Sequence, residues 1–468
     1  MATINAALNL ITGALQADQS ALNIVANNVA NANTPGYTQQ VPNWQENTPV
    51  QINGISYGTG VSETGASSLR DRVLEERLQQ EQQASSASAT RLAALDSVQA
   101  LFPPDSGSSS ARAGDIGSDI TGLFNSFASL EANPTDNSLR EQVLSTARTL
   151  AGDVSNAAAS LTAQRASLDQ EAASVISQVN SLTKAIAQLN VQIQSTSPHS
   201  DAGTLEDQRQ QDLSKLSELV GIHQIKTENN GISIATASGE TLVSEGSSYP
   251  LSTGTVNGYT HFFIGTSDIT SSLMAYGGKM GGFLTARDQD IPQVVAALDQ
   301  LAFGISTQVN ILNCAGSDLA QNAGTNLFSQ LATVPGSALS MTVIMTDPAQ
   351  IAAAASGQGS GDSANSAALA ALATKSIANG LTPSDFYSNF VTALGSTVSG
   401  VQIENTARNA SVTQLQTTRD SLSSVNLNDE AAMLQQFERS YQAASKVFAI
   451  LNSVMSSALN LGQQTTFS

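Results

Sequence analysis

The sequence predicts a mainly α-helical fold: a long antiparallel helical bundle with paired N- and C-terminal coiled-coil helices and a smaller β-rich subdomain. Three observations predict it. Apolar residues recur in steps of three and four near each end of the chain, and again in its middle, which is the spacing of a bundle helix. One stretch between them changes to strand-like runs separated by Asn-Gly turns. At 468 residues, the chain is long enough for about three domains.

The two ends each carry an apolar heptad stripe, which we call the N-terminal and C-terminal seams. Asp18 interrupts the first seam, either as a polar residue that sets register or as a solvated position. Neutral helices with many small residues can approach one another on several faces, which favours a sheath of several subunits; the alternative is that the two ends merely pair in a closed bundle. The N-terminal seam is Ile4, Leu8, Ile11, Leu15, Leu22, Val25 and Val29; the C-terminal seam is Leu434, Phe437, Tyr441, Ala444, Phe448, Leu451, Met455 and Ala458.

The middle of the chain is predicted to be mostly helical. The strongest pattern runs from Leu168 to Ile193 and indicates a long bundle helix, and weaker helical patterns cover 70–101, 138–161, 205–220, 294–312 and 386–422. Strand-like runs at 222–226, 232–236 and 259–264 form a β-meander, with Asn229-Asn230-Gly231 suited to a type I′ turn. We further expect a strand at 340–345, a flexible loop at 356–366 and a joint at 102–115.

These patterns divide the chain into six segments. The inner core domain consists of the terminal helices, and the bundle domain is interrupted by the β-rich segment. The expected segments are 1–34 (N-terminal coiled-coil helix), 35–69 (extended arm or linker), 70–221 (first part of the bundle), 222–285 (β-rich), 286–424 (second part of the bundle, with strand and loop at 331–375) and 425–468 (C-terminal coiled-coil helix).

The composition argues against several classes of partner. The formal net charge is −19, so nucleic acid is a poor partner. Charged residues make up 12% of the chain, about half of the roughly 25% in an average globular protein, so the surface is polar but weakly charged. The first cation is Arg70, and no charged side chain follows Lys446. With no basic region before an apolar stretch, and no run of about 18 apolar residues, we expect neither a cleavable signal peptide nor membrane insertion.

No catalytic residue, cofactor or metal site is predicted. The three histidines, His199, His223 and His261, lack the spacing that would direct two ligands at one metal ion. The glycines of 357–361 lack the Lys-Ser/Thr of a phosphate loop and are interpreted as a linker. The single cysteine, Cys314, cannot form an internal disulfide, and we expect its thiol to be buried or to cap a helix.

Residues 26–38, Ala-Asn-Asn-Val-Ala-Asn-Ala-Asn-Thr-Pro-Gly-Tyr-Thr, resemble the N-terminal signature of bacterial flagellar rod, hook and hook-associated proteins. We expect asparagines in left-handed conformations to end the helix, and a type II turn with Pro35 and Gly36 at its centre. The signature residues are Asn27, Asn28, Asn31, Thr34, Pro35, Gly36 and Tyr37.

The C-terminal segment, 425–434 with 441–448, resembles the matching terminal helix of the same group, and Asp429 and Glu430 fall in its first turn, where the helix dipole favours them. The region 277–288, Gly-Gly-Lys-Met-Gly-Gly-Phe-Leu-Thr-Ala-Arg-Asp, with Gly324-Thr-Asn-Leu-Phe, resembles the central region of the hook-associated protein 1 family. As a departure from that family, we expect no large inserted outer domain.

This resemblance implies a structural adaptor at the hook–filament junction, assembled as a ring or short helical layer on the distal end of the hook. It further implies contacts with the hook protein and with a second hook-associated junction protein, export through the flagellar type III apparatus to an extracellular location, and a chaperone on the C-terminal helix. A hook or rod subunit is the alternative, and a secreted peptidoglycan hydrolase is the alternative from another class.

Overall fold

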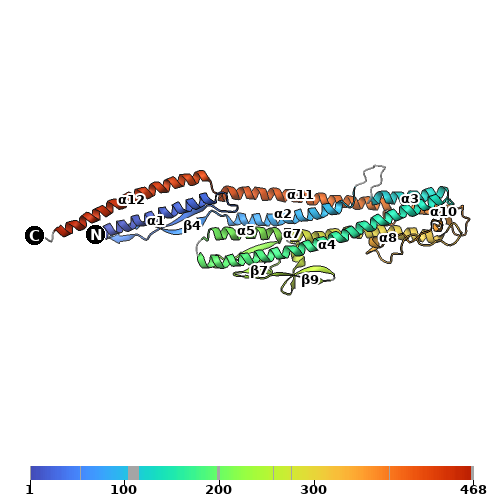
Figure 1. The fold of residues 1–468 in the computed structure, drawn as a ribbon, viewed down its shortest axis with the longest axis horizontal. Helices are drawn as coiled ribbons and strands as arrows, with labels where there is room; N and C mark the ends of the chain where they lie inside the picture. Colours follow the sequence, from blue (N-terminus) through green and yellow to red (C-terminus); the bar gives the residue numbers. More distant parts are fainter. Residues whose placement is uncertain are drawn as a thin grey trace.

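The computed structural model describes residues 2–52, 54–103, 115–197, 201–256, 258–275, 277–378 and 380–464. Over these residues the chain forms an elongated set of long helices, with small antiparallel sheets beside them (Figure 1). The predicted mainly α fold with a smaller β-rich part is confirmed. Both ends of the chain lie at the same tip of the molecule, as pairing of the terminal helices requires.

The long helices form an elongated rod, with the terminal helix pair at one end and the bundle along the rest. At one end α1 and α12 pack side by side; α2 then packs along α11, and α4 runs through the far half of the molecule beside α3, α5 and α8 (Figure 1). The helices are α1 (Ala2–Asn31), α2 (Arg72–Gln99), α3 (Ile116–Ala132), α4 (Asn137–Thr196), α5 (Thr204–Leu219), α6 (Thr270–Ala275), α7 (Gly278–Thr285), α8 (Ile291–Ala315), α9 (Ser337–Ser340), α10 (Ala364–Ala370), α11 (Pro383–Ser423) and α12 (Leu427–Gln464), with short π- or 3₁₀-turns η1 (Ala286–Asp290), η2 (Pro348–Gln350) and η3 (Ala371–Thr374).

The strands form a ribbon and two small sheets. In the ribbon β1 pairs with β4, and β2 with β3; the sheets have the strand orders β5-β6-β7-β8 and β11-β10-β9, and the short β12 pairs with β13. The strands are β1 (Gln40–Glu46), β2 (Val50–Ile52), β3 (Ile55–Tyr57), β4 (Val61–Ser68), β5 (Ile222–Lys226), β6 (Ile232–Thr236), β7 (Thr241–Ser244), β8 (Ser247–Ser248), β9 (Leu251–Val256), β10 (Tyr259–Ile264), β11 (Ser267–Asp268), β12 (Gly316–Ser317) and β13 (Ala354–Ala355).

Local chemistry explains where several elements begin. The carboxylates of Asp71, Asp115 and Asp136 accept backbone N–H bonds at the first turns of α2, α3 and α4, which are the preferred N-cap interactions. Asn229 and Asn230 both have positive φ, as the predicted type I′ turn between β5 and β6 requires.

Two apolar cores hold the middle of the molecule. One lies among α3, the first half of α4, α8 and α11, and the other between the second half of α4, α5 and the sheet of β5 to β8. A much smaller cluster of Ala21, Val25 and Phe437, flanked by Leu22 and Met433, lies between α1 and α12. The terminal pair therefore has little core of its own.

Several local expectations need correction. Residues 137–196 form one 60-residue helix instead of two, because no Gly or Pro separates the two patterns at 162–167. The helix α3 lies outside the expected helical patterns, and α6 and α7 at the end of the expected β-rich segment are helical. The strand expected at 340–345 is reduced to an isolated bridge between Phe328 and Val343.

Other corrections concern loops and single residues. The helix α10 begins inside the expected loop 356–366, where Asp362 accepts the N–H groups of Ala355 and Ala364. Most of the expected joint at 102–115 lies outside the described residues. Cys314 is exposed instead of buried or capping, and its thiol donates to Oδ1 of Asn326 at 3.2 Å. Asp18 is buried, so its interpretation as a solvated position is wrong.

Candidate assembly interface

The terminal helices pair in antiparallel orientation, with the ribbon along α1. Phe437 of α12 packs on Ala21 and Val25 of α1. Trp44 of β1 meets the Phe437 ring edge to face, with ring centroids 5.7 Å apart. A perpendicular aromatic pair of this kind contributes about 0.5–1.5 kcal/mol beyond its buried area. Phe437 therefore joins α1, α12 and the ribbon.

Only part of the two seams is covered within one chain. In α1, Ile11 and Val25 are buried; Ile4, Leu8, Leu15 and Leu22 are half-buried; and Val29 is exposed. In α12, Phe437 is buried, and Leu451 and Met455 are half-buried. More than a third of the surface of Leu434, Tyr441 and Phe448 stays accessible. Apolar residues outside the seam, among them Val447, Ile450 and Val454, are about half exposed or more. A helix with this much apolar surface in water is typical of an interaction site.

The signature turn joins α1 to the ribbon. Tyr37 N–H donates to the Thr34 carbonyl at 3.2 Å, and Gly36 has φ +78°, which is the geometry of the predicted type II turn. The Pro35 carbonyl accepts a hydrogen bond from Gln211 of α5 at 2.6 Å. The conformation demands glycine, and a Cβ on Gly36, 2.7 Å from that same amide, would also displace the Gln211 side chain.

The signature asparagines do not end α1 through left-handed conformations, because neither Asn31 nor Asn33 has positive φ. Their side chains act instead. Asn31 Nδ2 donates to the Asn27 carbonyl at 3.1 Å and to Asn27 Oδ1 at 2.6 Å, and Asn31 Oδ1 accepts from the Thr34 hydroxyl at 3.2 Å. The expectation about asparagine was therefore wrong in mechanism but correct in location.

Asn28 is completely buried, and four groups bind its side chain. Its Nδ2 donates to the Gln40 carbonyl at 2.8 Å and to Glu430 Oε1 at 2.9 Å. Its Oδ1 accepts from the Tyr37 hydroxyl at 2.9 Å and from Gln40 N–H at 3.0 Å. One amide therefore connects α1, the signature turn, β1 and α12.

Glu430 is also completely buried. Its Oε1 accepts a second hydrogen bond, from Gln39 Nε2 at 2.8 Å, whereas its Oε2 has no hydrogen-bond partner among the described residues. Burial raises the pKa of Glu430, and the bonds from Gln39 and Asn28 oppose that rise. Burial and the nearby carboxylates of Asp207 and Glu430 raise the pKa of Tyr37 to about 12, which keeps its hydroxyl protonated as a donor.

A second set of contacts fixes the ribbon to the bundle. Arg70, at the end of the ribbon, is almost fully buried and pairs with Glu206 at 3.0 Å and with Asp207. Asp207 also accepts Thr38 N–H at 3.3 Å. Burial raises the pKa of Asp207, while Arg70 opposes the rise. Glu206 and Asp207 stand in the first turn of α5, where the helix dipole favours carboxylates.

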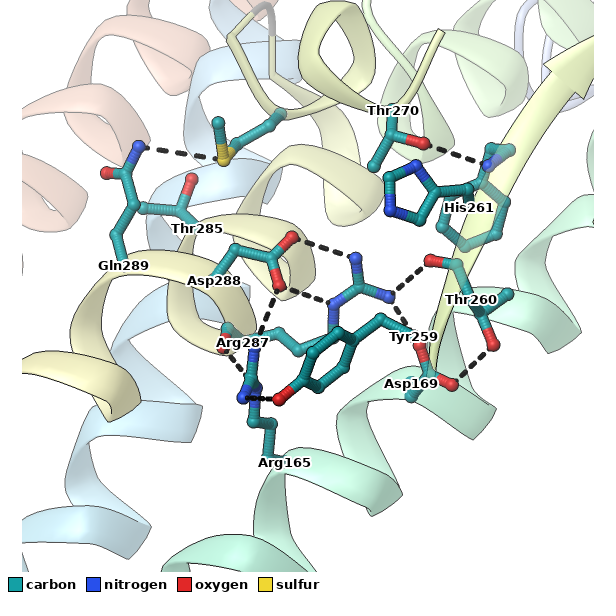
Figure 2. A network of polar contacts seen from close by, with 12 residues as sticks. Arg165, Asp169, Tyr259, Thr260, His261, Thr270, Thr285, Arg287, Asp288 and Gln289 are labelled. Carbon is teal, nitrogen blue, oxygen red and sulfur yellow. Dashed lines mark hydrogen bonds and ion pairs between the residues drawn. The ribbon is translucent and has the colours of Figure 1, made fainter. Parts of the chain in front are cut away.

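The glycine-rich region 277–288 leads to a second polar cluster, which holds the small β-sheet on α4 (Figure 2). Arg287 lies in the π-turn η1 and is almost completely buried. It makes two bonds to Asp288, at 2.9 and 2.8 Å, binds Asp169 of α4, and donates to the Thr260 carbonyl at 2.9 Å. Arg165 lies beside it (Figure 2). Its Cζ is 4.0 Å from the centroid of the Tyr259 ring.

Known proteins resemble the chain from end to end. The family model described as "Flagellar hook-associated protein FlgK helical domain" matches residues 107–328, and the model "Flagella basal body rod protein" matches residues 8–38. Flagellar hook-associated protein 1 of Salmonella typhimurium is 24% identical over 97% of this chain and 99% of its own length. That of Bacillus subtilis is 26% identical over 96% of each chain. The chain is therefore similar, over nearly its whole length, to flagellar hook-associated protein 1 of several bacteria.

The fold agrees with this similarity. The flagellar hook junction protein FlgK from Burkholderia pseudomallei has a TM-score of 0.67 and 18% identity, with 74% of this chain and 100% of that chain covered. The resemblance inferred from the signature and from the 277–288 region is therefore confirmed. The alignment to the Salmonella relative spans 556 positions against 468 residues here, so that family member carries segments that this chain lacks.

The relatives found by these comparisons are named as flagellar proteins. Over the described residues, we find no group of three or more His, Cys, Asp and Glu side chains placed to hold a metal ion. No described helix has the length and hydropathy needed to cross a membrane. His223 is exposed, His261 bonds Asp268 at 2.6 Å, and His199 lies outside the described residues.

Sequence reasoning found the seams and the signature turn but missed three polar contacts. It noted Glu430 only for its place in a first helical turn, and it attached no role to Arg70 or to the Glu206-Asp207 pair. The partners of Glu430 lie about 400 residues away along the chain, at Asn28 and Gln39. The available signal was the polar Asn28 at a helix position whose heptad equivalents Ala7, Ala14 and Ala21 are all alanine.

Proposed function

We propose that this chain assembles on the distal end of the flagellar hook and forms the junction on which the filament is built. Similarity to flagellar hook-associated protein 1 over nearly the whole length supports this role. The single structural observation that carries the proposal is the partly covered α1–α12 pair, because its exposed apolar residues need neighbouring subunits.

The seams are proposed as the contacts between subunits. Residues 1–34 and 425–468 would form the inner core domain, with 35–69 as the arm that carries it, and 70–221, 222–285 and 286–424 as the outer body. Because these ends carry few charges, packing of apolar side chains between copies would give a ring or short helical layer without strong charge repulsion.

The proposed partners follow from that position. The hook protein would contact one side of the layer and a second hook-associated protein the other, and the protein would work outside the cell. Before export, a chaperone would cover the apolar face of α12, which is exposed in the isolated chain. The proposal contains no catalytic step, and similarity to flagellar hook-associated proteins favours it over the secreted hydrolase.

A hook or rod subunit remains the second candidate, because residues 8–38 also match the basal body rod protein model. Deletion of the gene separates the two. The junction role predicts complete hooks without filaments by electron microscopy, and flagellin lost to the medium. A rod or hook role predicts missing hooks. Normal motile flagella in the deletion strain would contradict both.

A further inference from the structure

The heptad stripes do not by themselves fix how α1 and α12 align. A stripe that repeats every seven residues offers similar apolar contacts when one helix slides past the other by a heptad. The heptad-spaced residues at which the two helices meet are mostly small in α1 and mostly apolar in α12. The two series are Ala7, Ala14, Ala21 and Asn28 in α1, and Glu430, Phe437, Ala444, Leu451 and Ala458 in α12.

Each series has one polar member, and the two polar members meet. Asn28 Nδ2 lies 2.9 Å from Glu430 Oε1, and both residues are completely buried. A slide of one heptad would place Phe437 opposite Asn28, or Glu430 opposite Ala21. In the first case the amide loses its acceptor, and in the second the carboxylate loses its donor. Either change leaves a buried polar group without a partner, which is costly.

Residues of the arm, 35–69, further favour the native alignment of α1 and α12. Gln39 supplies the second N–H to Glu430 Oε1, while Gln40 and Tyr37 hold the Asn28 amide in the orientation that points Nδ2 at the carboxylate. Asp18, where the N-terminal seam is interrupted, is also a buried polar residue of α1. Its Oδ2 has no hydrogen-bond partner among the described residues, so that oxygen favours no alignment through a bond.

We infer that the Asn28–Glu430 contact sets the register of the terminal helix pair. A buried polar contact of this kind selects one alignment among several that apolar packing alone permits. The inference rests on the proposed use of the pair as the inner core domain, because only one register presents the exposed apolar residues of α12 at fixed positions to a neighbour.

The test measures register directly on the full-length chain, with spin labels at Gln16→Cys and Ser456→Cys in a Cys314→Ser background. Both label sites are exposed and are offset along the pair. A slide of seven residues moves one label by about 10 Å along the axis, at 1.5 Å per residue. Electron–electron distance measurements resolve such a change.

The chain with native Asn28 and Glu430 should give one distance. Glu430→Leu, which makes the α12 series fully apolar, should add a second population displaced by up to about 10 Å. Two variants should keep the single native distance: Glu430→Gln, which retains the accepting oxygen, and Gln436→Leu, which adds a leucine at an exposed position of the same helix.

A single, unchanged distance in Glu430→Leu would overturn the inference. If that variant separates the helices, the measurement is repeated with trimethylamine N-oxide, which strengthens apolar burial and restores pairing. The restored pair must then show the displaced population. A purely native distance would again contradict the inference. Since the isolated chain is measured, failure here leaves the junction role untouched, and failure of the junction role leaves the register result valid.

Discussion

Arg287 of η1 and Asp169 of α4 form an ion pair that ties the small β-sheet to the longest helix of the molecule. Arg287 is 1% exposed, and its remaining bonds go to Asp288 and to the Thr260 carbonyl in β10. Thr260 also donates its hydroxyl to Asp169 at 2.5 Å. The four residues therefore join α4, η1 and β10 in one network (Figure 2).

Arg287→Ala should destabilise the protein by about 1.5–3 kcal/mol, the usual contribution of hydrogen bonds to charged groups. The loss follows because Asp169, Asp288 and the Thr260 carbonyl lose the guanidinium, although both carboxylates stay partly solvated. Urea unfolding measures it. Arg148→Ala is the control, since Arg148 pairs with Glu141 on the exposed surface and should cost about 0–1 kcal/mol. Equal losses of unfolding free energy for the two substitutions would show that the buried network stabilises the protein no more than a surface ion pair does.

Stability should fall as the pH rises from about 4 to about 7, because of Asp119 in α3. Burial, a hydrogen bond with Asp153 and the nearby charge of Asp115 raise the pKa of Asp119 from 3.8 to about 7. A carboxyl whose pKa is raised by folding stabilises the protein below its unfolded pKa, and that contribution is lost as pH rises through the folded pKa.

The decline from Asp119 should therefore lie between about pH 4 and about pH 7, and Asp119→Asn should remove it. The melting temperature at several pH values, measured for both chains, checks this. At pH 8 the asparagine variant should melt higher than the native chain, since it has no charge to bury. A native chain that loses no more stability than the variant across this range would contradict the assignment.

Gly36→Ala should cost about 1–2 kcal/mol from its left-handed conformation alone, and more from the contact with Gln211. The second substitution Gln211→Ala should recover only the contact part, because the strain at φ +78° remains. Thermal unfolding of the single and double variants separates the two terms. Gly122→Ala, inside α3 with open space around its Cβ, should instead stabilise by about 0.5–1 kcal/mol. A neutral Gly36→Ala would argue against this turn geometry.

Much of the architecture is predictable because it rests on local periodicity. The seams of α1 and α12, the signature turn at Pro35 and Gly36, and the Asn229–Asn230 hairpin each depend on residues close together in sequence. The helix α3 was missed although its apolar residues Ile116, Ile120, Leu123 and Phe127 follow helical spacing. The glycine- and serine-rich segment directly before α3 favours a flexible joint, and this pattern obscured the start of the helix.

The polar contacts could not be predicted, because each depends on chain segments that only folding brings together. Arg70 meets Glu206 and Asp207 from 136 and 137 residues away, and Asn28 meets Glu430 from 402 residues away. Nor could the exposure of Cys314 be read from its apolar neighbours Ile311 and Leu312, since Ile311 itself is exposed on α8.

The proposed junction role through the terminal pair is tested most directly by a seam variant in a strain that lacks the native gene. This variant replaces three residues by alanine: Leu434, Phe437 and Leu451. The substitutions remove apolar contacts of α12 and leave both middle cores intact. Exposed Gln435, Gln436 and Asn452 replaced by alanine form the matched control. Electron microscopy should show bare hooks, with flagellin in the medium, for the seam variant and normal filaments for the control. Normal filaments on hooks that carry the seam variant would contradict the account.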